Sequence, residues 1–165
     1  QLRALSEQTN INFCYIIMNN LYGKNDNFNK DHGHVVPSLI HKFYLAKKNN
    51  SRVQLWGSPK TKRCLLYAKD AARMILQIMN KKIEIINLSA KNEISIGELA
   101  KLISKIYNFK GQIQWERKKF KGVDRRKLDL SLLNRFKIKE KYSLSTGLFE
   151  TIEWFTKNYK YIIRK

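Results

Sequence analysis

The chain has 165 residues, a normal size for one domain, and 43% of them are hydrophobic. That content is too high for a disordered segment, and no apolar run approaches the roughly 18 residues that a membrane span needs. The formal net charge is +20, spread along the chain apart from the basic run RKKFKGVDRRK at residues 117–127.

A charge of this size is compatible with a nucleic-acid-binding module. The sequence has no zinc-finger, basic-zipper or RNA-recognition signature, however. Lysine outnumbers arginine 24 to 9, and asparagine and isoleucine are also abundant, which is the bias that AT-rich codons impose. The composition therefore favours an anionic small-molecule substrate, and nucleic acid stays open only as a distant alternative.

The cysteines indicate the cellular compartment, and the first residues indicate whether the chain is part of a longer protein. Cys14 and Cys64 are too few for a disulfide framework, which predicts reduced thiols in a cytoplasmic protein. The chain opens on QLRALSEQ, which is typical of the end of an amphipathic helix. We therefore expect a fragment of a longer protein, truncated at its N-terminus.

The first half of the chain alternates strands and helices. Residues 11–18 (INFCYIIM) are apolar, β-branched and aromatic, which predicts a parallel strand buried on both faces. Such a strand needs neighbours in a sheet, and we expect them before Gln1. In order, we expect a helix end at 1–8, this strand, a loop at 19–34, a helix at 35–48, a strand at 52–57, a turn at 58–63, a short strand at 64–67 and a helix at 68–80.

The second half continues the alternation. Ser95 and Glu98 have the Ser-x-x-Glu spacing of a capping box, so a helix is expected to begin there. The remaining expected elements are a strand at 83–89, a helix at 95–107, a strand at 112–116, a short helix at 131–136 and a last helix at 143–159. The alternation predicts the α/β class.

Several motifs in fixed order carry a resemblance to a known family. NLYG at 20–23, NDNF at 25–28 and HVVPSLI at 34–40, followed by Lys42 and Phe43, resemble the GDP-L-fucose synthase family of extended short-chain dehydrogenases. The likeness continues through VQLWG at 53–57, INLSAKNEISIGELAKLI at 86–103, GVDRRKLDL at 122–130 and SLSTGLFETIEWF at 143–155. It covers essentially the whole chain.

The resemblance implies an α/β fold that is the distal part of an extended Rossmann-type fold, with the last parallel strands and a small substrate-binding domain. Residues 1–34 and about 52–90 would partly complete the Rossmann sheet, and the remainder of 1–165 would bind substrate. Family enzymes are about twice this length, and their first half binds NADP(H) and supplies a Ser/Tyr/Lys catalytic set. The glycines here form no Gly-x-Gly-x-x-Gly pattern.

The implied activity is NADPH-dependent conversion of GDP-4-dehydro-6-deoxy-D-mannose to GDP-L-fucose, by 3,5-epimerisation and reduction of the 4-keto group. The implied partners are a GDP-sugar, the missing N-terminal half and, since family members are homodimers, a second copy. The chain alone is expected to lack hydride transfer.

His34 is the candidate catalytic residue. Epimerising a carbon next to a ketone needs a group that removes and returns protons near neutral pH, and histidine titrates there. In the family, the histidine at this position is an acid/base in epimerisation. The alternative is a loop histidine that caps the helix after it.

Four residues at the end of the first strand and in the turn after it are candidates for cofactor binding, together with His34. In the family the turn at Met18, Asn19, Asn20 and Leu21 meets the nicotinamide half of NADP(H), and ligands of parallel sheets bind at the carboxyl ends of strands. The family usually has Pro-Thr where this chain has Met18 and Asn19. The alternative is an ordinary turn from strand to loop.

The candidate substrate-binding residues are Lys42, Trp56, Arg63 and Arg126, which match the family's substrate contacts. A diphosphate needs cations with directed donors, best met by arginine, and a base or sugar needs a flat apolar face. The alternatives are solvated charges and, for Trp56, a core position.

Departures from the family motifs keep other functions open. The family's Arg-Glu-Phe reads Arg63-Cys64-Leu65 here, and its Val-Asp-Asp reads Ala68-Lys69-Asp70. The alternatives to a fucose synthase are another sugar-nucleotide epimerase or dehydratase of the same fold, an inactive truncated relic, and the basic nucleic-acid module.

Overall fold

The computed structural model describes residues 1–116 and 124–162. Residues 117–123, which include most of the basic run and Gly122 and Val123 of a family-like motif, lie outside the described residues. The elements in chain order are α1 (Leu2–Thr9), β1 (Tyr15–Met18), β2 (Leu21–Tyr22), α2 (Val35–Lys48), β3 (Val53–Trp56), β4 (Lys62–Cys64), β5 (Leu66–Tyr67), α3 (Ala68–Met79), β6 (Ile85–Leu88), β7 (Glu93–Ser95), α4 (Ile96–Ile106), β8 (Ile113–Glu116), β9 (Arg125–Arg126), α5 (Ser131–Arg135) and α6 (Leu144–Ile162).

The strands form short ladders that are mostly parallel. β1 pairs with β6, β2 with β5 and β3 with β8, all in parallel. β4 lies between β7, which is antiparallel to it, and β9, which is parallel. Helices separate the parallel partners along the chain, as such connections require. The predicted α/β class is confirmed.

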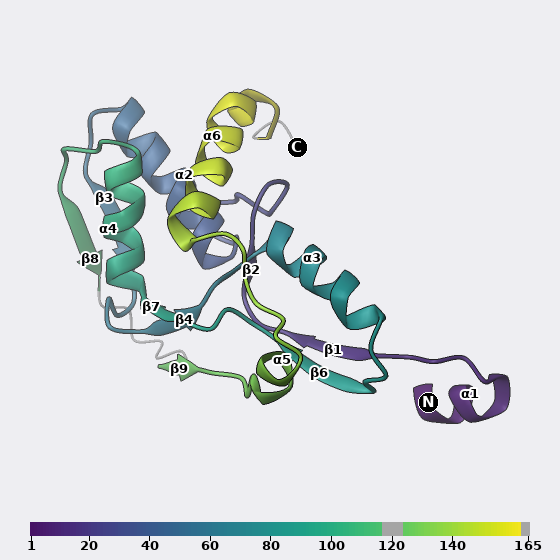
Figure 1. Cartoon of the computed structure of the whole chain (residues 1–165). Helices are drawn as coiled ribbons and strands as arrows, with labels where there is room; N and C mark the ends of the chain where they lie inside the picture. Colours follow the sequence, from purple (N-terminus) through teal and green to yellow (C-terminus); the bar gives the residue numbers. More distant parts are fainter. Residues whose placement is uncertain (117–123, 163–165) are drawn as a thin grey trace.

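The larger apolar core lies between α2, α4 and α6. α2 packs against β3 and α4, and α6 packs against α4 and β5 (Figure 1). Phe43, Leu99 and Phe155 are fully buried there. The capping box predicted for α4 is confirmed, because Ser95 Oγ accepts from the Glu98 amide at 3.1 Å and Glu98 Oε2 accepts from the Ser95 amide at 2.9 Å.

A second apolar core lies around the β1–β6 ladder. α5 packs against β6 and α3 runs alongside the ladder (Figure 1), and Met74, Ile78, Ile86, Leu88 and Leu133 are buried together in one cluster. Ile16 and Met18 face the same side as Ile86 and Leu88, because partners in a parallel ladder point to the same face.

The opposite face of the β1–β6 ladder is exposed, and the prediction of a strand buried on both faces was wrong. Tyr15 is 55% exposed, Ile17 is 40% exposed and Ile85 is 50% exposed. The strand is also shorter than 11–18, and its neighbour β6 comes from within the chain rather than from before Gln1. Apolar composition predicted the strand correctly, but burial depends on what covers it.

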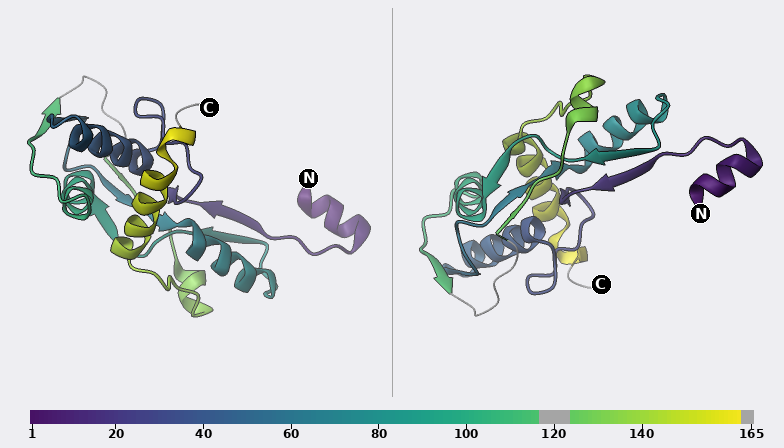
Figure 2. Two further views of the ribbon diagram at one scale, coloured as in Figure 1. Left: turned by 90° about the horizontal axis from the view of Figure 1, so that it is seen from above. Right: turned by 90° about the horizontal axis from the view of Figure 1, so that it is seen from below.

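The N-terminal helix α1 projects from the body of the molecule (Figure 2). None of its residues is buried, and Arg3 joins it to Glu84 through an ion pair of 2.8 Å. Leu2 and Leu5 are exposed apolar residues on this helix. The helix expected at 1–8 is confirmed, but here it contributes nothing to a core.

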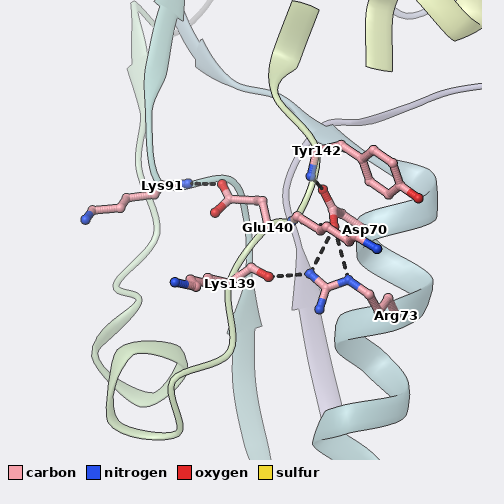
Figure 3. Close-up of polar contacts among 7 residues, drawn as sticks. Asp70, Arg73, Lys91, Lys139, Glu140 and Tyr142 are labelled. Carbon is pink, nitrogen blue, oxygen red and sulfur yellow. Dashed lines mark hydrogen bonds and ion pairs between the residues drawn. The ribbon is translucent and has the colours of Figure 1, made fainter. Parts of the chain in front are cut away.

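Residues 139–142, which lead into α6, are held by α3 and by the turn after β6, and we call this segment the latch. Asp70 accepts from the backbone amides of Lys141 at 2.8 Å and Tyr142 at 2.9 Å (Figure 3). Arg73 bonds both Asp70 and the carbonyl of Lys139. Glu140 Oε1 accepts from the Lys91 amide at 2.6 Å. The buried Asp70 and the partly exposed Arg73 and Glu140 thus position an irregular segment far away in sequence.

Short strands were the elements that the sequence analysis missed. The turn expected at 58–63 ends in β4, and the strand expected at 64–67 is divided between β4 and β5. β2, β7 and β9 have two or three residues each and were not predicted. In the part of the chain that the structure describes, no helix is long and apolar enough to span a bilayer.

Candidate functional site

A cavity of about 590 Å³ opens where β1 and β2 end and α2 begins, and we call it the His34 cavity. Six of the nine predicted site residues line it, namely Met18, Asn19, Asn20, Leu21, His34 and Arg63. They come from the end of β1, the start of β2, the loop before α2, and β4. The structure therefore brings all five predicted cofactor and catalytic residues together, with one of the predicted substrate-binding residues.

The floor of the His34 cavity is the step from β1 to β2. The Asn19 amide donates to the Leu88 carbonyl at 3.1 Å, so the chain still follows β6 at that point. The Leu66 amide then donates to the Asn20 carbonyl at 3.0 Å, so the chain has moved to β5. The Asn20 side chain donates to the Cys64 carbonyl at 3.3 Å and joins this step to β4.

Asn19 lines the cavity, and its side-chain amide has a buried donor without a partner among the described residues. Its Oδ1 accepts from the Asn20 backbone amide at 2.9 Å, which fixes which end of the amide is oxygen. Its Nδ2 is buried and has no partner among the described residues. Buried donors in native proteins are nearly always paired, so this unpaired Nδ2 marks the step from β1 to β2 as unusual.

His34 lies at the N-cap position of α2, but its side chain makes no capping bond. The imidazole is 80% exposed, and its Nδ1 lies 3.4 Å from Asp26 Oδ1. The alternative role of His34 as a helix-capping side chain is therefore not supported. The ring is open to the cavity and has a carboxylate beside it, an arrangement suited to proton transfer.

The loop that carries His34 is held by its own polar groups. Asn29 Oδ1 accepts from the amides of Asp31 and His32, each at 2.9 Å, and Ser38 Oγ donates to the Lys30 carbonyl at 2.6 Å. A Cβ on Gly33 would lie 2.4 Å from the carbonyl oxygens of Asn27 and Asn29, so only glycine fits there. The position of His34 is thus set by a folded loop.

His41, on α2, holds this loop through a hydrogen bond to its backbone. Its Nδ1 donates to the Phe28 carbonyl at 2.7 Å, while its Nε2 is buried without a partner among the described residues. Burial lowers the pKa of His41, the Phe28 carbonyl opposes that shift, and the charges of Lys30 and Asp31 act in opposite directions. The folded protein therefore favours the neutral imidazole.

We expect the stability of the protein to fall as the pH drops through 6.5, the ordinary pKa of His41. The unfolded chain takes up the proton there, while the folded chain resists it, so this contribution is fully present only above that pH. The change in melting temperature between pH 7.5 and 5.5 should be smaller in His41→Asn, whose amide can still donate to the Phe28 carbonyl. The exposed-site variant His32→Asn should follow the wild type. Equal pH dependence in all three proteins would contradict this expectation.

Arg63 and Arg126 lie side by side on neighbouring strands. They are register partners in the parallel β4–β9 ladder, so their side chains share one face. Arg63 lines the His34 cavity and also donates to the Lys62 carbonyl at 2.7 Å. Arg126 is exposed. Two arginines on one face of the sheet, one of them lining the cavity, suit a doubly charged anion.

Lys42 and Trp56 line a second, smaller cavity of about 180 Å³. Lys42 Nζ lies 3.8 Å from the centroid of the Trp56 ring, a cation–π contact, and Trp56 remains 41% exposed. Val35 lines both cavities, which makes them neighbours. The structure therefore separates these two predicted residues from His34 but keeps them close by.

The sequence analysis missed three residues that line the His34 cavity. Tyr22, Lys24 and Asp26 belong to the NLYG and NDNF motifs or lie between them, but they were read only as part of a resemblance. Burial raises the pKa of Tyr22, so the phenol stays protonated. Only the proximity of Asp26 to His34, eight residues away, indicates a role for that carboxylate.

Two curated relatives carry the resemblance that the motifs indicated. The chain is 34% identical over 142 residues to GDP-L-fucose synthase 1 of Arabidopsis thaliana, a match covering 84% of this chain and 44% of the relative. It is 33% identical over 140 residues to the GDP-L-colitose synthase of Yersinia pseudotuberculosis, covering 82% and 46%. The chain spans about half the length of the curated relatives it matches.

A solved structure and a family model agree with these relatives. The fold is similar to a GDP-L-fucose synthetase from Naegleria fowleri bound to NADP, with a TM-score of 0.85, 33% identity, and coverage of 96% of this chain and 50% of the other. The resemblance to GDP-L-fucose synthases and the Rossmann-type fold are thus confirmed. Residues 1–89 match the model of the NAD-dependent epimerase/dehydratase family, and the chain belongs to that family.

Proposed function

We propose that this chain supplies the substrate-binding half of an NADP(H)-dependent enzyme that converts GDP-4-dehydro-6-deoxy-D-mannose to GDP-L-fucose. The observation that carries the proposal is the His34 cavity, in which the predicted proton-transfer residue, a diphosphate-binding arginine and the cofactor turn lie together. The relatives' names support this substrate class. The two free thiols, Cys14 and Cys64, are consistent with a cytoplasmic enzyme.

The nicotinamide end of NADP(H) fits the step from β1 to β2. The buried Nδ2 of Asn19 is a donor suited to the carboxamide oxygen, and the side chains of Met18 and Leu21 add apolar surface for the ring. When bound, the cofactor supplies the hydride for reduction of the 4-keto group. We propose that Asn20 positions Asn19 through the hydrogen bonds that it donates to Asn19 Oδ1.

The chain's own residues would bind the substrate and move its protons. Arg63 and Arg126 bind the diphosphate, and their adjacent guanidinium groups match its charge. Lys42 and Trp56 bind the nucleoside side of the substrate. His34 accepts and returns protons at the carbons beside the keto group, with Asp26 next to its ring.

A complementary unit would cover the exposed face of the β1–β6 ladder. Tyr15, Ile17 and Ile85 form an apolar face without cover among the described residues, and the relatives have about as much chain again. We propose that an equivalent of their other half packs there. In this division, residues 1–34 and about 52–90 complete the dinucleotide-binding sheet, and the remainder binds the sugar nucleotide.

The test is binding of GDP to the purified chain by titration calorimetry. GDP is expected to bind more tightly than UDP, and Arg63→Ala is expected to weaken binding by about 10- to 100-fold, since a charge-assisted hydrogen bond contributes about 1.5–3 kcal/mol. Arg52→Ala is the matched control, because it removes the same charge from an exposed loop position. Equal binding by all three proteins, or none by the wild type, would overturn the proposal.

The GDP-L-colitose synthase relative supports a second candidate, a GDP-sugar epimerase-reductase that acts on a different deoxy sugar. Both candidates share the GDP test. Comparing turnover of the two GDP-4-keto sugars, with the complementary unit present, separates them.

A further inference from the structure

Glu93 and Arg125 form an ion pair across the three-stranded sheet β7-β4-β9. Arg125 Nε lies 2.8 Å from Glu93 Oε1 and 3.0 Å from Oε2, and Nη2 lies 2.5 Å from Oε2. The Glu93 side chain is 12% exposed and that of Arg125 is 62% exposed. Arg125 holds the pKa of Glu93 below its ordinary value, so the pair is ionised at neutral pH.

The pair joins the two outer strands over the central one. β4 lies between β7 and β9, with Cys64 opposite Glu93 and Lys62 opposite Arg125. Register partners point to the same face, so Lys62, Cys64, Glu93 and Arg125 share one face of this sheet. The ion pair therefore ties β9 to β7 across the width of the sheet.

The other face carries the paired arginines. Arg63 is the register partner of both Ile94 and Arg126, so these side chains lie on the face opposite the ion pair. β9 has only two residues and pairs with one strand. A slip of one residue would exchange the faces of Arg125 and Arg126 and remove Arg126 from the side of Arg63.

We propose that Glu93 and Arg125 are positioning residues that lock the register of β9 and thereby hold Arg126 beside Arg63 as a two-guanidinium anion site. Two pairs of residues fix the register of β9 against β4 only weakly. The ion pair adds a side-chain contact that favours the same register, on the face opposite Arg63 and Arg126. The inference rests on the proposed function only for the identity of the anion, a nucleoside diphosphate.

Charge reversal tests whether the ion pair locks the register of β9, which we call the lock, because it distinguishes an effect on register from an effect of net charge on GDP binding. Glu93→Arg adds positive charge and Arg125→Glu removes it, so bulk attraction alone predicts that the first strengthens GDP binding and the second weakens it. The lock predicts that both weaken it, by about tenfold, within the range of coupling between contacting residues. The double variant restores the pair with its polarity reversed and should recover affinity. The milder Glu93→Gln should weaken binding in the same direction.

A second readout does not depend on the ligand. The Lys62 amide donates to the Asp124 carbonyl at 3.0 Å, a bond of the β4–β9 ladder. Its hydrogen exchange should be faster in each single variant and slow again in the double variant. Matched reversals of the exposed pair Glu153 and Lys157 on α6 should leave both readouts unchanged.

The outcomes separate the two proposals. If Glu93→Arg binds GDP as well as the wild type, or the double variant does not recover, the lock is overturned. If wild type fails to bind GDP, the proposed function fails, and the Lys62 exchange rates alone then decide for or against the lock.

Discussion

Asp70→Ala is expected to lower the free energy of unfolding by about 2–4 kcal/mol, because it removes a buried acceptor from two backbone amides and one partly exposed guanidinium. Asp70 is 1% exposed and accepts from two backbone amides of the latch as well as from Arg73. Its loss leaves the Lys141 and Tyr142 amides and the Arg73 guanidinium short of an acceptor, and each such group carries its own desolvation penalty. Urea denaturation monitored by circular dichroism measures the change.

The control for this prediction is Asp31→Ala on the exposed loop before α2. Among the described residues, the Asp31 carboxylate makes a distant ion pair with Lys30, at 3.9 Å, so its loss should change the free energy of unfolding by less than about 0.5 kcal/mol. If Asp70→Ala and Asp31→Ala changed the free energy of unfolding equally, the stability contributed by the latch would not depend on Asp70.

His34→Asn is expected to lower the rate of proton exchange at the epimerised carbons by about 10²–10⁴-fold, the usual contribution of a general acid or base. The imidazole is 80% exposed and makes no helix-capping bond, so the substitution removes chemistry without removing packing. Incorporation of solvent deuterium into the GDP-4-keto sugar, followed by NMR, measures the rate. Affinity for GDP and the melting temperature should stay close to the wild-type values.

The matched control is His32→Asn, on the same loop but outside the residues that line the His34 cavity. It should exchange deuterium at the wild-type rate. A His34→Asn protein that still exchanges at that rate would refute the role of His34 in proton transfer.

Local signals in the sequence predicted the long elements well. The capping box before α4 is a property of neighbouring residues, and the helices expected at 35–48 and 95–107 are both confirmed. β9 could not be predicted this way, because two arginines become a strand only by pairing with β4, about 60 residues earlier. The predicted burial of β1 on both faces was wrong for a related reason. Apolar content shows that a strand could be covered, but it does not show which part of the protein covers it.

The candidate site was predicted in its parts but not in its arrangement. Motif order indicated His34 and the turn at 18–21, which do meet in one cavity. The same motifs did not indicate Asp26 as the neighbour of His34, nor the contact that holds Lys42 over Trp56. Asp70 matches the last residue of a family motif, but its contact with the latch could not be predicted, because the amides that it accepts from are more than 70 residues away. Such contacts depend on the tertiary fold.

The step from β1 to β2 has a mechanical consequence. Between Asn19 and Asn20 the chain passes from the ladder with β6 to the ladder with β5, so any sliding of one ladder against the other must be absorbed by these two residues. A ligand bound at this step would contact both ladders at once and would restrict their movement relative to each other. Ligand affinity and the stiffness of the molecule would therefore rise together, because they depend on the same peptide group.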